Sequence, residues 1–290
     1  MASLKEVKGR IATVNNTRKI TSAMKMVASA KLHKAQGAIT NMLPYERRLH
    51  GLLTNLLGGG EVLVWNTPRE VKRVALVVFS SNSSLCGGFN ANVIKHATQW
   101  LSEYQALGKD NILLYPVGKK VADALSKMGY AVQGNFQHLA DKPSFAEAAE
   151  LAQGLMNLFT QGEVDKVELL YNHFKSTASQ ILTREVYLPF LLSNPEQNEG
   201  SRVHPQETDY ILEPSREELL ETLLPKVLRM KLYTVLLDSN ASEHAARTMA
   251  MQIATDNADD LLQELTLMYN KTRQQAITNE LLDIVGGSMA

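Results

Sequence analysis

The chain of 290 residues is long enough for one large domain or two smaller ones, and its 44% apolar content excludes disorder of the whole chain. Thirty basic and thirty acidic side chains cancel, which excludes a global charge that would draw the chain to nucleic acid or to an anionic membrane. A single cysteine, Cys86, excludes an internal disulfide and fits a reducing compartment.

Neither a membrane-spanning segment nor a targeting segment is predicted. The longest apolar run in the strand-like regions, 74–79, is far shorter than the about 20 residues that a spanning helix needs. The first ten residues are charged and lack the apolar core of a secretion signal, and no Ser/Arg-rich transit segment follows them. We therefore expect a chain that folds from its first residue and does not cross a membrane.

Residues 1–58 are predicted to form one long helix that pairs with another helix. Apolar side chains occupy twelve of the sixteen positions that alternate three and four residues apart from Leu4 to Leu56. This heptad pattern fails locally at Arg18, Thr21 and Lys25. Three apolar residues form a second stripe on another helix face there: Ile20, Met24 and Val27. We expect that face to contact a partner, and the glycines of 58–60 to end the helix.

The same helix is strongly basic. Residues 1–60 contain ten basic and two acidic side chains, a net charge of +8 that the rest of the chain balances. Nucleic-acid binding would require aromatic side chains among the basic ones, and none precedes Tyr45. A membrane-surface helix would require Trp or Phe on its apolar face, and that face has neither. The charge therefore favours a protein partner with acidic segments, which would guide association.

Residues 70–192 are predicted to form an α/β domain. The pattern changes from a buried strand to a glycine-containing loop and then to a helix, which is the start of a β-α-β unit. The predicted strands cover 71–79, 111–117, 130–133, 166–174 and 180–190, and the predicted helices cover 91–107, 121–129 and 145–162. The last strand alternates like a member of an antiparallel pair. About 120 residues is an ordinary size for such a domain.

Motifs for bond chemistry are not found in the sequence. LCGGFN (85–90) lies between a strand and a helix, where a phosphate loop could lie, but the glycine patterns of nucleotide-binding loops are missing. In PVGKK (116–120) we expect a helix start. Cys86 is expected to be a small buried residue, and the aspartates at 256, 259 and 260 to form a solvated helix face. We predict no catalytic residue, cofactor or metal site.

The end of the chain is predicted to form a second long helix. Residues 193–209 are polar and predict a linker or loop, and residues 210–290 then read as helical, without Gly or Pro from 226 to 285. Apolar residues recur through this helix and predict a seam: Leu232, Val235, Ala246, Met249, Ile253, Leu261, Leu265, Met268, Ile277, Leu281 and Val285. The simplest arrangement pairs it antiparallel with residues 1–58. Its apolar tip is expected to be buried in its own fold or, as the two long helices favour, inside a surrounding protein sleeve.

Four stretches carry a specific resemblance to a known family. They are IATVNNTRKITSAMKMVASAKLHKA (11–35), LCGGFNAN (85–92), SEHAARTMAMQIATDNADDL (242–261) and LTLMYNKTRQQAITNELLDIVGG (265–287). In order and spacing they resemble the gamma subunits of F-type ATP synthases, over essentially the whole chain.

The resemblance implies a fold and a role. The fold is an antiparallel coiled coil of the terminal helices plus a Rossmann-like α/β domain. The role is the non-catalytic rotor of the central stalk, which couples ion flow to conformational cycling of the beta catalytic sites. The implied partners are the ring of three alpha and three beta subunits, the epsilon subunit and the membrane c-ring. The implied location is peripheral, at the cytoplasmic face of a bacterial inner membrane.

The resemblance also implies individual contact residues. Arg273, Gln274 and Thr278 match positions that contact a beta catch loop. Met24 and Lys25 match positions that face the beta lever, and the neighbouring surface comprises Arg18, Lys19, Ile20 and Val27. The family often has Asp-Arg-Gly where this chain has Asn82-Ser83-Ser84, so polar contacts made there by the charged residues are in doubt. The cysteine pair of chloroplast forms is absent, which excludes dithiol regulation.

Two other classes of protein stay open. A nucleotide-binding α/β enzyme with helical extensions would bind ATP or NAD as an isolated chain. A coiled-coil adaptor unrelated to a rotary machine would have a stable partner other than an alpha-beta ring.

Overall fold

The computed structural model describes most of the chain, in two compact units. The described residues are 3–57, 65, 67–190, 212–213 and 215–288. One unit comprises residues 1–30 and 247–290, and the other comprises residues 31–246. Two long helices contribute to both units: α1 (Leu4–Leu57) and α6 (Arg216–Ser288). The predicted glycine stop at 58–60 and the predicted loop 193–209 lie outside the described residues.

In the first unit, α1 and α6 pair antiparallel. Arg18 contacts Asp259, and Thr21, one turn later on α1, contacts Thr255, one turn earlier on α6. The buried side chains between the helices are small or medium in size: Val7, Ala28, Met251 and Ala258. The predicted antiparallel pairing of the terminal helices is therefore confirmed within this unit.

The seam of α6 in this unit differs from the predicted one. The apolar residues expected in the seam are exposed, Met249 by 41% and Ile253 by 53%, whereas Met251 and Ala258 are buried. Five more of the expected seam residues are 48–58% exposed: Leu261, Met268, Ile277, Leu281 and Val285. Up to Met268 the reason is that apolar residues occur on more faces of α6 than one partner helix can cover. Beyond it, α6 continues past the start of α1, because the antiparallel pair Arg18–Asp259 lies only fourteen residues from Leu4, where α1 begins. The sequence therefore has surplus apolar surface here.

The second unit contains a four-stranded sheet in the order β2-β1-β3-β4. Its strands are β1 (Val74–Phe79), β2 (Ile112–Val117), β3 (Lys166–Phe174) and β4 (Gln180–Leu188). Strands β2 and β3 flank β1 in parallel, with Val74 opposite both Ile112 and Lys166. Strand β4 is antiparallel to β3, as its alternating sequence predicts.

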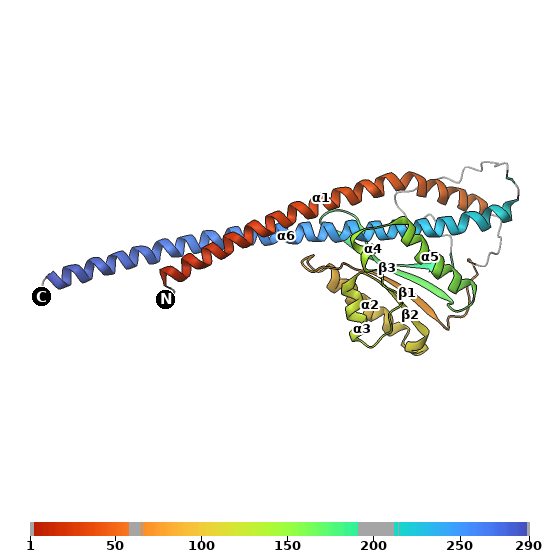
Figure 1. Cartoon of the computed structure of the whole chain (residues 1–290), viewed down its shortest axis with the longest axis horizontal. Helices are drawn as coiled ribbons and strands as arrows, with labels where there is room; N and C mark the ends of the chain where they lie inside the picture. Colours follow the sequence, from red (N-terminus) through yellow and green to blue (C-terminus); the bar gives the residue numbers. More distant parts are fainter. Residues whose placement is uncertain (1–2, 58–64, 66, 191–211, 214, 289–290) are drawn as a thin grey trace. The chain divides into compact units, whose positions relative to one another are not determined.

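Helices cover both faces of this sheet (Figure 1). Helices α2 (Phe89–Glu103) and α3 (Lys119–Lys127) lie on one face, and α4 (Gln137–Asp141) and α5 (Phe145–Thr160) lie on the other. Two short 3-10 helices, η1 (Gln105–Leu107) and η2 (Lys109–Asn111), connect α2 to β2. The predicted α/β elements are confirmed with two differences: α4 is additional, and the weak strand at 130–133 is only an isolated bridge between Val132 and Leu114.

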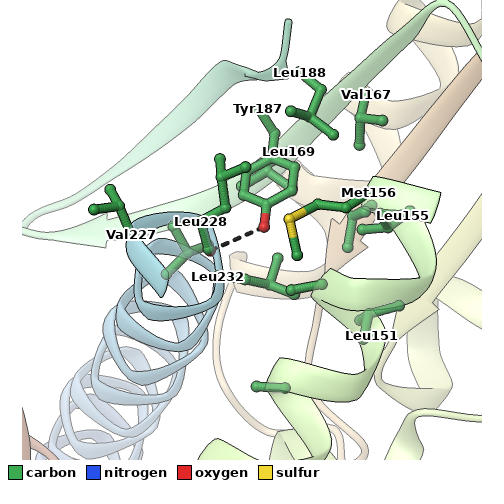
Figure 2. Packing of buried hydrophobic residues seen from close by; sticks show 14 of the residues in the cluster. Leu151, Leu155, Met156, Val167, Leu169, Tyr187, Leu188, Val227, Leu228 and Leu232 are labelled. Atoms are coloured by element: carbon green, nitrogen blue, oxygen red, sulfur yellow. Dashed lines mark hydrogen bonds between the residues drawn. The ribbon is translucent and has the colours of Figure 1, made fainter. Parts of the chain in front are cut away.

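Alternation along β1 explains why the unit has two cores. Val74, Leu76 and Val78 pack toward α2 and α3, whereas Ala75 and Val77 pack toward α5. The second core also takes in leucines from α1 (Leu49, Leu53 and Leu56) and apolar residues of α6 between 220 and 236. Figure 2 shows this junction, where Tyr187 of β4 reaches α6 and its hydroxyl donates to the carbonyl of Leu228 at 2.9 Å. Among the described helices, none has the length and hydropathy to span a membrane.

Candidate functional site

The predicted contact residues near the end of α6 lie on the surface of the helix. Arg273, Gln274 and Thr278 are all exposed. Gln274 and Thr278 are one helical turn apart and share a face. The Thr278 hydroxyl donates to the carbonyl of Gln274 at 2.9 Å. The geometry offers a guanidinium and an amide for contacts with another chain.

The predicted contact residues on α1 fall into two groups. Ile20 and Val27 are 60% and 59% exposed, and Lys19 is exposed as well. Met24 and Lys25 are half-buried against the helix pair. Of the second stripe inferred from the sequence, Ile20 and Val27 therefore face outward in this unit, beside Lys19, whereas Met24 is half-buried.

Arg18 has a different environment from its neighbours. Its Nη1 lies 2.9 Å from Oδ1 of Asp259 on α6. Beside this pair, the hydroxyl oxygens of Thr21 and Thr255 are 2.9 Å apart. The interruption of the heptad pattern is therefore a polar layer within the helix pair, because polar side chains of α1 meet polar side chains of α6 there.

The last turns of α6 carry an exposed apolar cluster. Its members are 49–67% exposed: Ile277, Leu281, Leu282, Ile284 and Val285. A helix end of this kind leaves apolar surface in water unless another protein covers it. Burial of the tip within its own unit, one of the two expectations from the sequence, is therefore wrong for these residues.

A groove runs between α1 and α6 in the same unit. It is open to solvent and has a volume of about 520 Å³. Its lining combines small, apolar and charged residues: Glu6, Gly9, Arg10, Thr13, Val14, Leu261, Glu264, Leu265 and Met268. Arg10 is held by Glu6 at 2.7 Å on the same helix. Because the groove is open to solvent, it suits contact with a protein better than enclosure of a small ligand.

The loop at 85–90 is filled by the chain's own side chains. Asn90 accepts the backbone N–H of Ser81 at 3.1 Å and donates to the sulfur of Cys86 at 3.1 Å. Cys86 is 2% exposed, as expected of a small buried residue. At the start of α3, the N–H of Val121 donates to the hydroxyl of Ser80 at 3.1 Å. This edge of the sheet is closed by internal hydrogen bonds, which argues against a phosphate site there.

Asn82 is a structural residue that the sequence did not identify as such. Its Oδ1 accepts the backbone N–H of Lys119 at 2.8 Å, at the first turn of α3. Its Nδ2 donates to the carbonyl of Gln137 at 2.6 Å and to a carboxylate oxygen of Asp141 at 2.7 Å, both on α4. The amide therefore joins α3 to α4, and only a side chain that both accepts and donates can do so.

A buried carboxylate is another feature that the sequence did not indicate. Glu168 of β3 is 2% exposed and accepts hydrogen bonds from Trp100 at 2.7 Å, Tyr104 at 2.8 Å and Lys166 at 2.8 Å. Arg184 of β4 lies 3.1 Å away. Burial alone would raise the pKa of Glu168, but the hydrogen bonds from Lys166 and Tyr104 and the nearby cations outweigh it and lower the pKa. The cluster joins α2, β3 and β4 and has the character of a structural ion pair.

No cluster of three His, Cys, Asp or Glu side chains gathers as metal ligands in the described part of the chain. The charged groups with shifted pKa values in the α/β unit belong to the Glu168 cluster. These groups are engaged with one another, so the arrangement offers no poised acid or base. The outward faces of the paired helices are therefore the candidate functional site.

Known proteins share this chain's sequence along its whole length. A family model described as ATP synthase matches residues 3–290. The chain is 68% identical to an ATP synthase gamma chain of Phocaeicola vulgatus, over 100% of both chains. It is 48% identical to an ATP synthase gamma chain of Flavobacterium johnsoniae, over 100% of this chain and 99% of that one.

Solved structures share its fold. One chain of the Euglena gracilis mitochondrial ATP synthase (OSCP/F1/c-ring, rotational state 3) aligns with a TM-score of 0.63 at 19% identity. The alignment covers 99% of this chain and 93% of that one. A chain of the Tetrahymena thermophila mitochondrial ATP synthase, from a structure of the central stalk and c-ring, gives a TM-score of 0.56 at 24% identity, covering 81% and 99%.

Proposed function

This chain belongs to the family of ATP synthase gamma chains. We propose that the exposed faces of its two long helices contact the subunits that surround it. It is a non-catalytic subunit of the central stalk, and the catalytic sites lie in the beta subunits. Its partners are the alpha and beta subunits of the catalytic ring and the c-ring of the membrane sector. The epsilon subunit is the further partner that we propose, on the resemblance of the sequence.

The mechanical requirement is a surface that differs around the helix pair. A shaft can bias three equivalent catalytic sites only if it binds them unequally, because a ligand shifts an equilibrium only by its differential affinity. The pair supplies such a surface, since Ile20, Val27 and Lys19 are outward on α1 while Arg18 faces α6. Rotation would present this lysine-edged apolar face to each beta subunit in turn.

The proposed contacts are those that the sequence resemblance implies, and they are compatible with this asymmetry. Met24 and Lys25, with Lys19, Ile20 and Val27, face the beta lever, where lysines attract acidic side chains and apolar groups supply contact area. Arg273, Gln274 and Thr278 contact the beta catch loop. Arg18 contributes indirectly through its pair with Asp259.

The exposed apolar tip of α6 is the observation that carries the proposal. Leu282 and Ile284 are 63% and 67% exposed, in a part of α6 that continues past the start of α1. Covering this surface removes apolar area from water, which stabilises an assembly in which a protein collar surrounds the helix end. The adaptor alternative would also use exposed apolar surface, but it does not account for the family. The nucleotide-binding alternative is disfavoured by the closed edge at 80–90.

The chain is a peripheral subunit of a membrane-associated complex. We propose that it acts at the cytoplasmic face of a bacterial inner membrane. The support is the 68% identity to a bacterial gamma chain over full length.

Charge reversal at the lever-facing surface tests the proposed contacts. The double variant Lys19→Glu with Lys25→Glu is assembled into the organism's complete ATP synthase in membrane vesicles. The assay follows ATP hydrolysis and ATP-driven ion pumping. We expect both rates to fall by about tenfold or more, since like charges would then meet at the interface. Lys127→Glu, an exposed reversal on α3, is the matched control. Unchanged coupling in the double variant would overturn the electrostatic part of the proposal.

A further inference from the structure

Strand β3 extends beyond its parallel neighbour. The register of β1 with β3 ends at the pair Val78–Leu170, while β3 continues to Phe174 alongside β4. Backbone groups of β3 beyond that point are bound by side chains of α6. The hydroxyl of Ser242 donates to the carbonyl of Asn172 at 2.8 Å, and the N–H of Phe174 donates to Oδ1 of Asp238 at 2.8 Å.

The α6 residues in these bonds are well shielded from water. Ser242 is fully buried and the side chain of Asp238 is 14% exposed. The two residues lie four apart and share one helix face. The second carboxylate oxygen of Asp238 lies 2.6 Å from Nδ1 of His173, so Asp238 holds two consecutive residues of β3.

A third residue extends the contact to the neighbouring helix. Asn240 is 8% exposed, and its Nδ2 donates to the carbonyl of Ala140 on α4 at 2.7 Å. Within five consecutive positions, α6 therefore binds the end of a central strand and the end of a helix. We call Asp238, Asn240 and Ser242 the α6 latch.

We propose that the α6 latch fixes the α/β sheet to helix α6 against torsion, and that its residues are positioning residues for energy coupling. The proposal rests on the function proposed above. Apolar packing resists separation but is not directional, whereas a buried hydrogen bond holds one orientation. The bonds of Asn240 and Ser242 are buried, so water does not readily replace them when torque is applied.

Another polar contact between α6 and the sheet supplies a matched control. Lys231 pairs with Glu185 of β4 at 2.9 Å, but both side chains are about one-third exposed. Exposed pairs of this kind contribute little because water competes for both partners. Removing this pair should leave the attachment of the sheet to α6 unchanged, whereas removing the latch should weaken it.

The first test measures the joint locally, by amide hydrogen exchange of the full-length chain. In Asp238→Asn with Ser242→Ala, we expect exchange of amides near Phe174 to accelerate about fivefold or more relative to the amides of β1. Lys231→Ala removes the exposed pair but keeps the hydrogen bond from Tyr171 of β3 to Glu185, so it should leave that ratio unchanged. If the double latch variant does not fold, Ser242→Ala alone is used. Unchanged relative exchange in a folded latch variant would overturn the proposal.

The second test measures the mechanical role in the assembled complex. The ring is fixed to a surface, a probe is attached at Lys95→Cys on the exposed side of α2, and angular fluctuations are recorded during catalytic pauses. We expect the latch variant to increase the variance of the probe angle by about twofold, because apolar packing still holds the sheet to α6 in part. The control variant of the Lys231–Glu185 pair should match the parent. An unchanged variance would contradict the latch. Absence of ATP-driven rotation in the parent would instead contradict the proposed function.

Discussion

Arg18 of α1 and Asp259 of α6 form an ion pair across the terminal helix pair, with Nη1 and Oδ1 2.9 Å apart. The pair lies next to the contact between Thr21 and Thr255. Polar layers in coiled coils favour one register over others, because a slip separates the polar partners. In this chain, a slip of one heptad toward the start of α1 would place Asp259 near Ile11, which cannot pair with a carboxylate.

A charge swap tests this register role. Arg18→Asp should destabilise the full-length chain by about 0.5–1 kcal/mol, a small effect because both side chains are over two-fifths exposed. Arg18→Asp combined with Asp259→Arg should restore the loss. Urea unfolding of the two single variants and the double variant measures the coupling. Additive losses in the double variant would show that the pair does not interact.

Glu168→Gln tests the buried ion cluster. Removing the charge leaves Lys166 and Arg184 without their buried partner, so we expect a loss of about 3 kcal/mol at neutral pH. Because folding lowers the pKa of Glu168, its contribution is complete above the ordinary glutamate pKa and disappears as pH falls through the lowered value. Parent and variant should therefore converge in acid when urea unfolding is repeated across pH.

The control for this prediction is Glu103→Gln, which removes a carboxylate bound to the same Arg184 but 56% exposed. Its effect at neutral pH should be much smaller. Equal losses from both variants, or a difference that does not change with pH, would be inconsistent with the role given to Glu168.

Asn82→Asp tests the joint between α3 and α4. The aspartate would still accept the N–H of Lys119 but would place a second carboxylate against Asp141, so we expect a loss of about 1–2 kcal/mol. Asp141→Asn in the same chain should recover most of it, because an amide then faces the new carboxylate. Thermal unfolding of the single and double variants measures both effects on stability. An unchanged stability of Asn82→Asp would contradict the role of Asn82 in joining α3 to α4.

The tip of α6 is tested by separating folding from assembly. Leu281→Ser with Ile284→Ser changes side chains that are 58% and 67% exposed. The free energy of unfolding of the isolated chain should therefore stay within about 0.5 kcal/mol of that of the parent. Assembly with alpha and beta subunits should fall, measured as the fraction of chain that copurifies with the ring. Normal assembly would show that the tip needs no cover.

Much of the fold could be predicted from local patterns. The heptad spacing of α1 and the apolar runs of β1 and β3 indicate which side chains are buried. The structure has these elements close to their predicted bounds. The stretch without Gly and Pro from 226 to 285 predicted a long last helix, because these two residue types disfavour the interior of a helix. The resemblance supplied the site residues, because nothing in their spacing alone indicates a contact with another subunit.

The remaining features depend on contacts between distant segments. Apolar residues such as Met249 and Ile253 read as seam positions, but only the partner helix determines which face is covered. The partners of Glu168 come from three separate elements, and Asn82 and Asp238 bind backbone groups of residues far along the chain. A sequence pattern does not encode such pairings, so these polar joints appear only in three dimensions.

Direct observation of rotation tests the central claim that this chain is the turning stalk of an ATP synthase. Because Cys86 is buried, a thiol probe can be directed to Lys95→Cys in a complex whose alpha and beta subunits are fixed to a surface. We expect ATP to make the probe rotate in one direction, in steps that slow by about tenfold or more when Lys19 and Lys25 are reversed. A probe that stays still while the complex hydrolyses ATP at its full rate would contradict it.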